Sequence, residues 1–473
     1  MNITDPEYLN FTARLEDRYF NNGHPQRGTP VDQLGYGRWE ADYITLRAGG
    51  SDHETATVEV MRRIEAIEHP APPPAPLPPG TSCTPLEGYL RLYGHSFGDD
   101  TGPRRVQFCS WFPAFRIYRD NPDEFKRQLD RVMGNWQGIR MYWWLLGYGW
   151  EQNGNSVDPR WPDIDTIIHG ALTECAHRNL KVAMTSGDLY AIPEGEIPGM
   201  YRKIASVCAG VNETVVAMSS VINESWMTSP FGEDFPRYAE YSKQWQSRYP
   251  WGQHGLTCPS TMEDEAGLVA SSIAPATVTL LQGTRLPGQN CFGRAFTVEY
   301  EGRRNKGIKP IVEEEPGGNG PDVYQPMNDH DDLLGLYTIK ILTGQFLMSF
   351  NGSSLYNKTP LDTYWGFKEI PALWKQMEMP QDVGQWVCKP LHHTDSPCTG
   401  SGMARLDGVT NGSLYYGVVS GDRDWTIGPS RWDADATIYD STGSIFSKVV
   451  RAGETIKQYS GTPKTKVIRL VRR

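Results

Sequence analysis

The sequence has 473 residues, of which 38% are hydrophobic and 22% charged, and its formal net charge is −10. This composition excludes a disordered chain and indicates a globular protein. The acidic balance and the lack of a basic stripe argue against a nucleic-acid partner. No apolar run approaches the roughly 18 residues of a membrane-spanning helix, and the first residues lack the pattern of a signal peptide. We therefore expect no membrane partner, and the location is left open, with the cytoplasm and a virion as candidates.

The eight cysteines show no CxxC pair and no Cys/His spacing typical of zinc. Cys388 and Cys398 are close in sequence, and we expect them to be reduced, with a loop-stapling disulfide as the alternative. The acidic run Glu313, Glu314 and Glu315, with the aspartates at 329, 331 and 332, has calcium-binding side chains but no recognised loop pattern. We expect no metal and no cofactor.

Residues 1–69 are predicted to form a small helical module. Its clearest element is a helix over 51–67, with Ser51 as the capping residue and Val60, Ile64 and Ile67 on one face. Residues 70–80 are rich in proline, which is typical of an extended, semi-rigid linker.

Residues 81–380 alternate between strand-like and helix-like segments. The predicted strands are 106–111, 139–143, 182–186, 215–222, 255–258, 277–282, 310–315 and 345–350. Predicted helices include one opened by Asn121 and Pro122, with Phe125, Leu129 and Met133 at helical spacing, and others over 164–176 and 331–342.

Eight strands with intervening helices in about 270 residues predict a (β/α)8 TIM barrel. A short hairpin around 89–102 is expected to seal the bottom of this barrel. An open doubly wound sheet is the alternative, but no GxGxxG motif or P-loop comes after the first strand. Residues 381–473 carry short strand patterns separated by Gly, Asn and Asp turns, which predict a C-terminal antiparallel β domain resembling a sandwich.

Two of the predicted strands end in residues that could catalyse a reaction. The fourth strand ends in Asn223-Glu224, and the seventh ends in the three glutamates. In a barrel of this kind, residues at the carboxyl ends of the strands line the active site. Glycoside hydrolysis requires two carboxyl groups that flank the scissile bond.

With these residues in place, the sequence resembles the clan A glycoside hydrolases, the (β/α)8 group that includes cellulases and mannanases. Arg140 on the second strand adds to the resemblance, because the clan often carries an arginine there that supports the nucleophile. The resemblance implies that Glu224 is the general acid/base, that Asn223 binds the sugar 2-hydroxyl, and that a seventh-strand glutamate is the nucleophile.

The identity of the nucleophile is left open by the motif. Strand alternation places Ile311, Glu313 and Glu315 on one face and Glu314 on the other. Glu315, immediately before Pro316, matches the usual strand-end position best, so it is favoured over Glu313, with Glu314 third.

Several other residues are expected near the substrate. Asp188 comes after the third strand and either lines the site or caps the next helix. Trp143, Trp144 and Trp226 occupy positions suited to stacking on sugar rings, and we expect at least one of them to do so. His254 is expected to be structural.

The sequence therefore predicts a retaining glycoside hydrolase with a carbohydrate substrate and a role in polysaccharide degradation. The sixth and eighth strand ends depart from the clan pattern, so the sugar is left open. The alternative is a non-catalytic carbohydrate-binding or structural barrel of a phage particle. In that case residues 1–69, which weakly resemble segments of phage-encoded proteins, would attach it to a larger assembly.

Overall fold

The structure is a computed structural model. The chain divides into two compact units, Met1–Ala75 and Pro76–Arg473. The structure describes residues 6–16, 42–44, 46–47, 52–68, 83–146, 154–187, 189–190, 192–257, 273–282, 309–320, 327, 329–355, 359–390, 396–402, 405–421, 424–461 and 464–473. Within these ranges, no helix is long and apolar enough to cross a membrane.

The first unit contains helices α1 (Pro6–Glu16) and α4 (His53–Glu68), which contact each other. The rings of Phe11 and Tyr43 stack with their centroids 4.1 Å apart. The predicted helix is confirmed as α4. Its cap is Asp52, which accepts a hydrogen bond from the Thr55 backbone N–H at 2.8 Å, whereas Ser51 lies outside the described residues.

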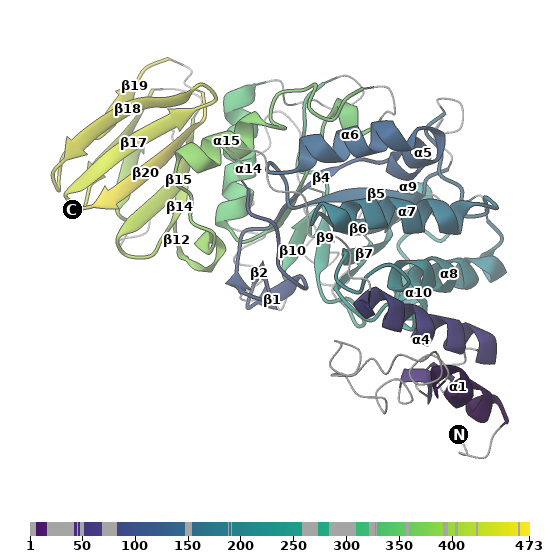
Figure 1. Ribbon diagram of the computed structural model, residues 1–473. Coiled ribbons are helices and arrows are strands. Elements are labelled where there is room, and N and C mark those ends of the chain that lie inside the picture. The colour runs from purple at the N-terminus through teal and green to yellow at the C-terminus, as the bar shows by residue number, and fades with distance from the viewer. Residues whose placement is uncertain are drawn as a thin grey trace. The chain divides into compact units, whose positions relative to one another are not determined.

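The second unit is built around eight parallel strands, as predicted (Figure 1). They are hydrogen-bonded in the order β8-β7-β6-β5-β4-β11-β10-β9. The two ends of this order also meet, because the backbone N–H groups of Thr277 and Val278 donate to His254 O at 2.8 and 3.3 Å, which closes the sheet into a barrel. The strands are β4 (Gln107–Ser110), β5 (Gly138–Trp144), β6 (Lys181–Ser186), β7 (Val216–Ile222), β8 (Gln253–Thr257), β9 (Thr279–Leu281), β10 (Ile311–Glu313) and β11 (Phe346–Ser349).

Helices cover the outside of the barrel. The longer ones are α5 (Ala114–Asp120), α6 (Pro122–Val132), α7 (Ile164–His177), α8 (Ile197–Ala209), α10 (Phe235–Gln246), α14 (His330–Leu342) and α15 (Glu369–Gln376). Shorter turns are η2 (Glu194–Glu196), α9 (Ser225–Thr228), η4 (Gly352–Ser354) and η5 (Val383–Gln385). The predicted start of α6 is confirmed, since the Asn121 side chain accepts from the Glu124 N–H and Pro122 is the first helical residue.

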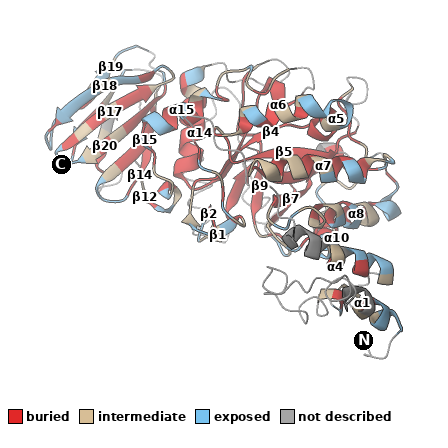
Figure 2. Cartoon of the chain, in the orientation of Figure 1, coloured by how far each residue is buried: buried red, intermediate tan, exposed pale blue. Residues whose placement is uncertain are grey.

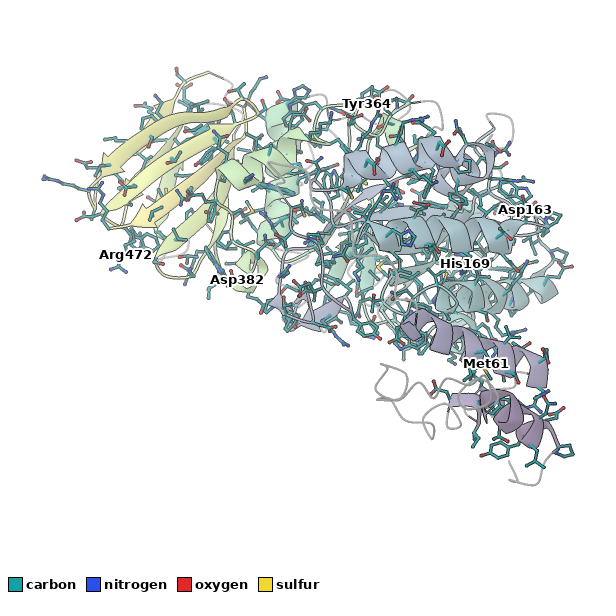
Figure 3. All side chains as sticks on the ribbon, in the orientation of Figure 1. Met61, Asp163, His169, Tyr364, Asp382 and Arg472 are labelled. Atoms are coloured by element: carbon teal, nitrogen blue, oxygen red, sulfur yellow. The ribbon has the colours of Figure 1, made fainter. Side chains whose placement is uncertain are left out.

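Most of these helices turn an apolar stripe toward the barrel and a polar face outward, whereas α14 is buried almost all round. On α7, Ile164, Ile167 and Ile168 are buried, whereas His169 points away from the sheet (Figure 3). The strands are buried on both faces, as is usual for a parallel sheet covered by helices. Figure 2 shows the resulting core, with buried residues along the strands and exposed ones on the outer helix faces.

The N-terminal end of the barrel is sealed by a small sheet, as predicted. Its strands are β1 (Arg91–Tyr93), β2 (Ser96–Asp99) and β3 (Gly102–Pro103). Leu90 and Phe97 belong to the same buried cluster as the barrel interior. The Phe97 ring meets Phe346 edge-on at 5.6 Å, and Gln253 Nε2 donates to Leu90 O at 2.8 Å.

The C-terminal part forms two antiparallel sheets with a shared apolar core, which confirms the predicted β domain. Cys388 and Cys398 are not joined in a disulfide and are reduced, as expected. The strands are β12 (Val387–Pro390), β13 (Cys398–Gly402), β14 (Arg405–Thr410), β15 (Leu414–Ser420), β16 (Trp425–Ser430), β17 (Ala434–Asp440), β18 (Gly443–Val450), β19 (Lys457–Tyr459) and β20 (Lys466–Arg472).

This β domain packs against α14, the helix between the seventh and eighth barrel strands (Figure 1). Asp331 on α14 accepts from Lys466 Nζ at 2.7 Å and from the Ser441 N–H at 2.9 Å. The Tyr416 hydroxyl donates to Met377 O at 2.8 Å. The helix that comes after β10 thus contacts the barrel strand β11 on one side and the strands β15 and β20 of the β domain on the other.

Candidate active site

The candidate site lies at the carboxyl end of the barrel. Parallel strands bring their carboxyl ends to one edge, so the ends of β5, β7 and β10 meet there. Arg140 lies within β5, Asn223 and Glu224 come directly after β7, and Glu314 and Glu315 directly after β10.

Arg140 joins the three strand ends. Its Nη1 donates to Glu315 Oε1 at 3.0 Å and to Glu314 O at 3.2 Å. Its Nη2 donates to Asn223 Oδ1 at 2.8 Å, and its Nε donates to Thr185 Oγ1 at 3.2 Å. The guanidinium is fully buried. Burial would lower its pKa, but the neighbouring carboxylates outweigh that effect and hold the pKa above its usual value.

The Asn223 amide has a fixed orientation. Its Oδ1 accepts a second hydrogen bond, from Gln282 Nε2 at 2.9 Å, in addition to the one from Arg140. Two donors at the oxygen place the amide nitrogen on the other side, where its N–H groups can donate to a ligand. Gln282, directly after β9, thus helps to orient the Asn223 amide.

Glu224 has an unusual backbone conformation. Its φ is +48°, in the left-handed region that side chains other than glycine rarely adopt. Its carbonyl accepts from the Thr228 N–H at 3.0 Å, which starts α9 directly after the strand. The side chain is partly exposed at the mouth of the barrel. Strained backbone of this kind is concentrated at functional sites.

Glu313 faces away from this cluster. Its Oε2 accepts from Lys340 Nζ on α14 at 2.8 Å, and neither side chain has more than 1% exposure. The predicted grouping of Glu313 with Glu315 on one face is therefore wrong. The regular strand ends at Glu313, so alternation does not continue to Glu315, which turns into the mouth and reaches Arg140.

Glu314 lies beneath the cluster, inside the barrel. Its side chain is fully buried, and its Oε1 lies 3.5 Å from Arg140 Nη2. Burial raises the pKa of Glu314 to about 7; the Glu315 carboxylate raises it too, whereas Arg140 acts in the opposite direction.

The next residues are those that were expected to stack on or bind the sugar. Trp143 has 0% exposure and packs in the helix layer, against Tyr201 at 5.1 Å and Trp245 at 6.2 Å. The expectation that it stacks on substrate is wrong, because it faces the helices. Trp226 belongs to α9, but its side chain is outside the described part, and Asp188 lies outside it altogether.

Tyr142 is a site residue that the sequence analysis missed. It lies two positions after Arg140 and therefore shares its inward face. Its ring centroid is 4.9 Å from the guanidinium carbon and 4.3 Å from the Phe112 ring. Its hydroxyl is buried without a hydrogen-bond partner among the described residues. Strand alternation counted from Arg140 would have identified it.

His254 is structural, as expected. Its Nδ1 lies 2.8 Å from Ser219 Oγ on the helix-facing side of β7. Burial lowers the pKa of His254 to about 4, so the ring is neutral at physiological pH.

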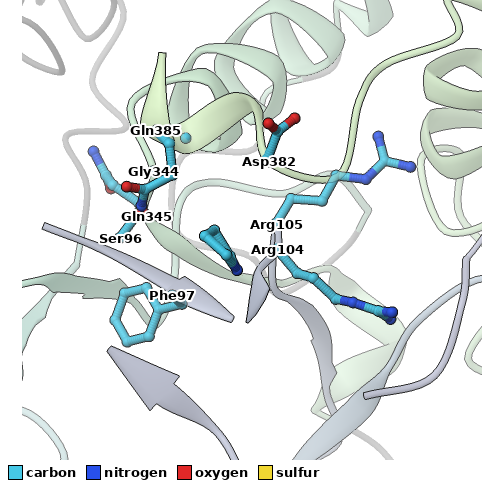
Figure 4. A pocket seen from close by; sticks show the side chains of 10 residues that line it. Ser96, Phe97, Arg104, Arg105, Gly344, Gln345, Asp382 and Gln385 are labelled. Carbon is cyan, nitrogen blue, oxygen red and sulfur yellow. The ribbon is translucent and has the colours of Figure 1, made fainter. Parts of the chain in front are cut away.

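The hollow in Figure 4 lies at the opposite end of the barrel. It is a shallow space of about 190 Å³, part of it open to solvent, between the β2–β3 hairpin and η5, and its lining includes Phe97, Gln345 and Asp382. It is remote from the glutamates and plays no part in the candidate site.

Several acidic residues that were considered as calcium ligands have partners within the protein. Glu313 pairs with Lys340 and Asp331 with Lys466, while Asp329 caps α14. Across the described ranges, no three His, Cys, Asp or Glu side chains are grouped so as to hold a metal ion.

No protein-family model and no curated protein matches the sequence. Solved structures share the fold. A candidate glycoside hydrolase from Bacteroides vulgatus ATCC 8482 superposes with a TM-score of 0.56 over 82% of each chain, at 10% identity. A family 30 endoxylanase from Clostridium papyrosolvens C71 gives a TM-score of 0.43 over 82% of this chain and 100% of its own, at 10% identity. A family 39 glycoside hydrolase from Bacteroides cellulosilyticus WH2 gives 0.44 over 78% and 81%, at 13% identity. The first of these likenesses establishes a fold shared with a glycoside hydrolase-like barrel.

Proposed function

We propose that the protein is a retaining glycoside hydrolase that acts on a poly- or oligosaccharide. The observation that carries the proposal is the Arg140 network, in which one buried guanidinium binds both the Glu315 carboxylate and the Asn223 amide next to Glu224. This arrangement supports a pair of carboxyl groups on opposite sides of the barrel mouth, as the reaction requires.

In the proposed reaction, a Glu315 oxygen attacks the anomeric carbon while the glycosidic bond breaks. The leaving oxygen takes the proton of Glu224, and a glycosyl ester forms on Glu315. Glu224, now ionised, then removes a proton from water, whose oxygen attacks the same carbon and frees Glu315. Net retention requires the two carboxyl groups to lie about 5–5.5 Å apart.

Glu315 is the best-supported nucleophile of the three glutamates. A charge-assisted hydrogen bond from Arg140 stabilises its ionised form, and it sits 5% exposed at the mouth. Glu314 is enclosed beneath it, and Glu313 is neutralised by Lys340 on the helix side. The N–H groups of the Asn223 amide suit a hydrogen bond to the sugar 2-hydroxyl.

The test is hydrolysis of a panel of plant, algal and bacterial polysaccharides by the wild type, Glu224→Gln and Glu315→Gln. Glu240→Gln, on the exposed face of α10, is the matched control for the same chemical change. We expect product release by the wild type and the control, and a loss of at least about a hundredfold in each active-site variant. No turnover on any substrate, with glycan binding retained, would favour a binding-only barrel.

A further inference from the structure

The hydrolytic chemistry leaves one buried acid without a role. Glu314 has no exposed side-chain surface, and neither of its carboxyl oxygens accepts a hydrogen bond from a described residue. The Ser220 hydroxyl lies beside it but outside hydrogen-bonding geometry. A carboxylate ion in such a place lacks the donors that water would supply, so the protonated form is favoured.

Arg140 meets this need only weakly, because most of its donors are already committed. Of its five N–H groups, four donate to Thr185, Glu314 O, Glu315 and Asn223. The Glu314 carboxyl is left with a 3.5 Å approach to Nη2. One guanidinium thus serves two acids, and its hydrogen-bond geometry favours Glu315.

The charged and titratable groups around Glu314 also favour an ionised Glu315 beside a protonated Glu314. They come from its own strand end and from β5, and are Glu313, Glu315, Arg140 and Tyr142. Glu313 is paired with Lys340, whereas a second full negative charge at Glu314 would repel the ionised Glu315.

We propose that Glu314 is a positioning residue that carries a proton in the active enzyme and thereby leaves the Arg140 guanidinium to Glu315. When Glu314 loses the proton, it competes for Nη2 and adds a negative charge beside the catalytic pair. The proposal rests on the hydrolytic function above for its consequence, but the protonation itself can be measured without substrate.

The first experiment compares the thermal unfolding of the wild type and Glu314→Gln from about pH 5 to pH 8. An acid whose folded-state pKa lies above its unfolded value stabilises the fold below the unfolded pKa, and this contribution is lost as pH rises through the folded pKa. The glutamine variant cannot titrate, so its Tm relative to the wild type should rise by several degrees across this window. A difference that is independent of pH, or that falls, would overturn the proposal. So would failure of Glu314→Gln to fold, because a protonated acid should tolerate its neutral isostere.

The second experiment is the pH profile of kcat/KM on whichever polysaccharide is cleaved. Loss of protons from Glu314 and from the general acid should give the wild type an alkaline limb with a slope approaching two. Glu314→Gln should show a slope of one, and Glu240→Gln should match the wild type. If Glu314 only fills space in the core, the slope of the alkaline limb will be the same in Glu314→Gln as in the wild type, and this result would contradict the proposal. If no substrate is cleaved, the hydrolase assignment fails, and the Tm comparison alone decides the state of Glu314.

Discussion

The buried ion pair between β10 and α14 allows a direct test of whether Glu313 is a structural residue and not the nucleophile. Glu313 and Lys340 are 2.8 Å apart and essentially unexposed. If this pair is structural, each partner depends on the other to compensate a charge that has left water. Removing one partner leaves an unpaired charge in the core, which typically costs about 3–5 kcal/mol.

The perturbation is a double-mutant cycle of Glu313→Leu and Lys340→Met. Each single change should lower the free energy of unfolding by about 3–5 kcal/mol, a large share of the roughly 5–15 kcal/mol available to a folded protein. The double variant should recover most of this loss, because two apolar side chains of similar size replace the pair. The coupling energy between the two positions should therefore be several kcal/mol, well above the usual range for independent sites.

The assay is urea-induced unfolding followed by tryptophan fluorescence. Arg116→Met is the matched control, because Arg116 pairs with Asp120 at 2.5 Å on the exposed face of α5. Surface pairs of this kind contribute at most about 1 kcal/mol. If Lys340→Met costs no more than Arg116→Met, the pair does not anchor Glu313, and Glu313 returns as a candidate nucleophile.

Other buried groups give three further predictions. The pKa of His254 is lowered from 6.5 to about 4, so the unfolded chain binds a proton there first and stability falls as pH drops from about 6.5 to 4. The loss should be about 3 kcal/mol in a pH series, and His254→Asn should lack it. Trp143→Phe should lower Tm through lost packing while leaving KM unchanged; a raised KM would instead place Trp143 at the substrate. Lys466→Met should leave Asp331 without this cation, and limited proteolysis should then release the β domain faster than from the wild type.

Most of the fold could be predicted because its strands are buried on both faces. The strand β7 is buried along its whole length and mostly apolar, and its predicted range, 215–222, differs by one residue from the observed Val216–Ile222. The helix start at Asn121 could also be predicted, because the capping hydrogen bond joins residues only three positions apart. At α4 two adjacent residues could cap the helix, and composition alone could not choose Asp52 over Ser51.

The site was harder to predict because it depends on where a strand stops. Three consecutive glutamates carry no sequence mark that regular alternation ends at Glu313. Its partner Lys340 is 27 residues away on a helix, and only the packed structure brings the two together. Trp143 is different, since it lies three positions after the inward-facing Arg140 and alternation already placed it on the opposite face.

In the proposed reaction, Glu315 forms the covalent bond to the sugar. Incubation with a panel of 2-deoxy-2-fluoro glycosides bearing good leaving groups should slow the second step and allow the glycosyl ester to accumulate. Peptide mass spectrometry would then identify the labelled residue. We predict a single adduct on Glu315, absent in Glu315→Gln. An adduct on Glu313 or Glu314, or a cleaved substrate whose product has inverted configuration, would contradict the account.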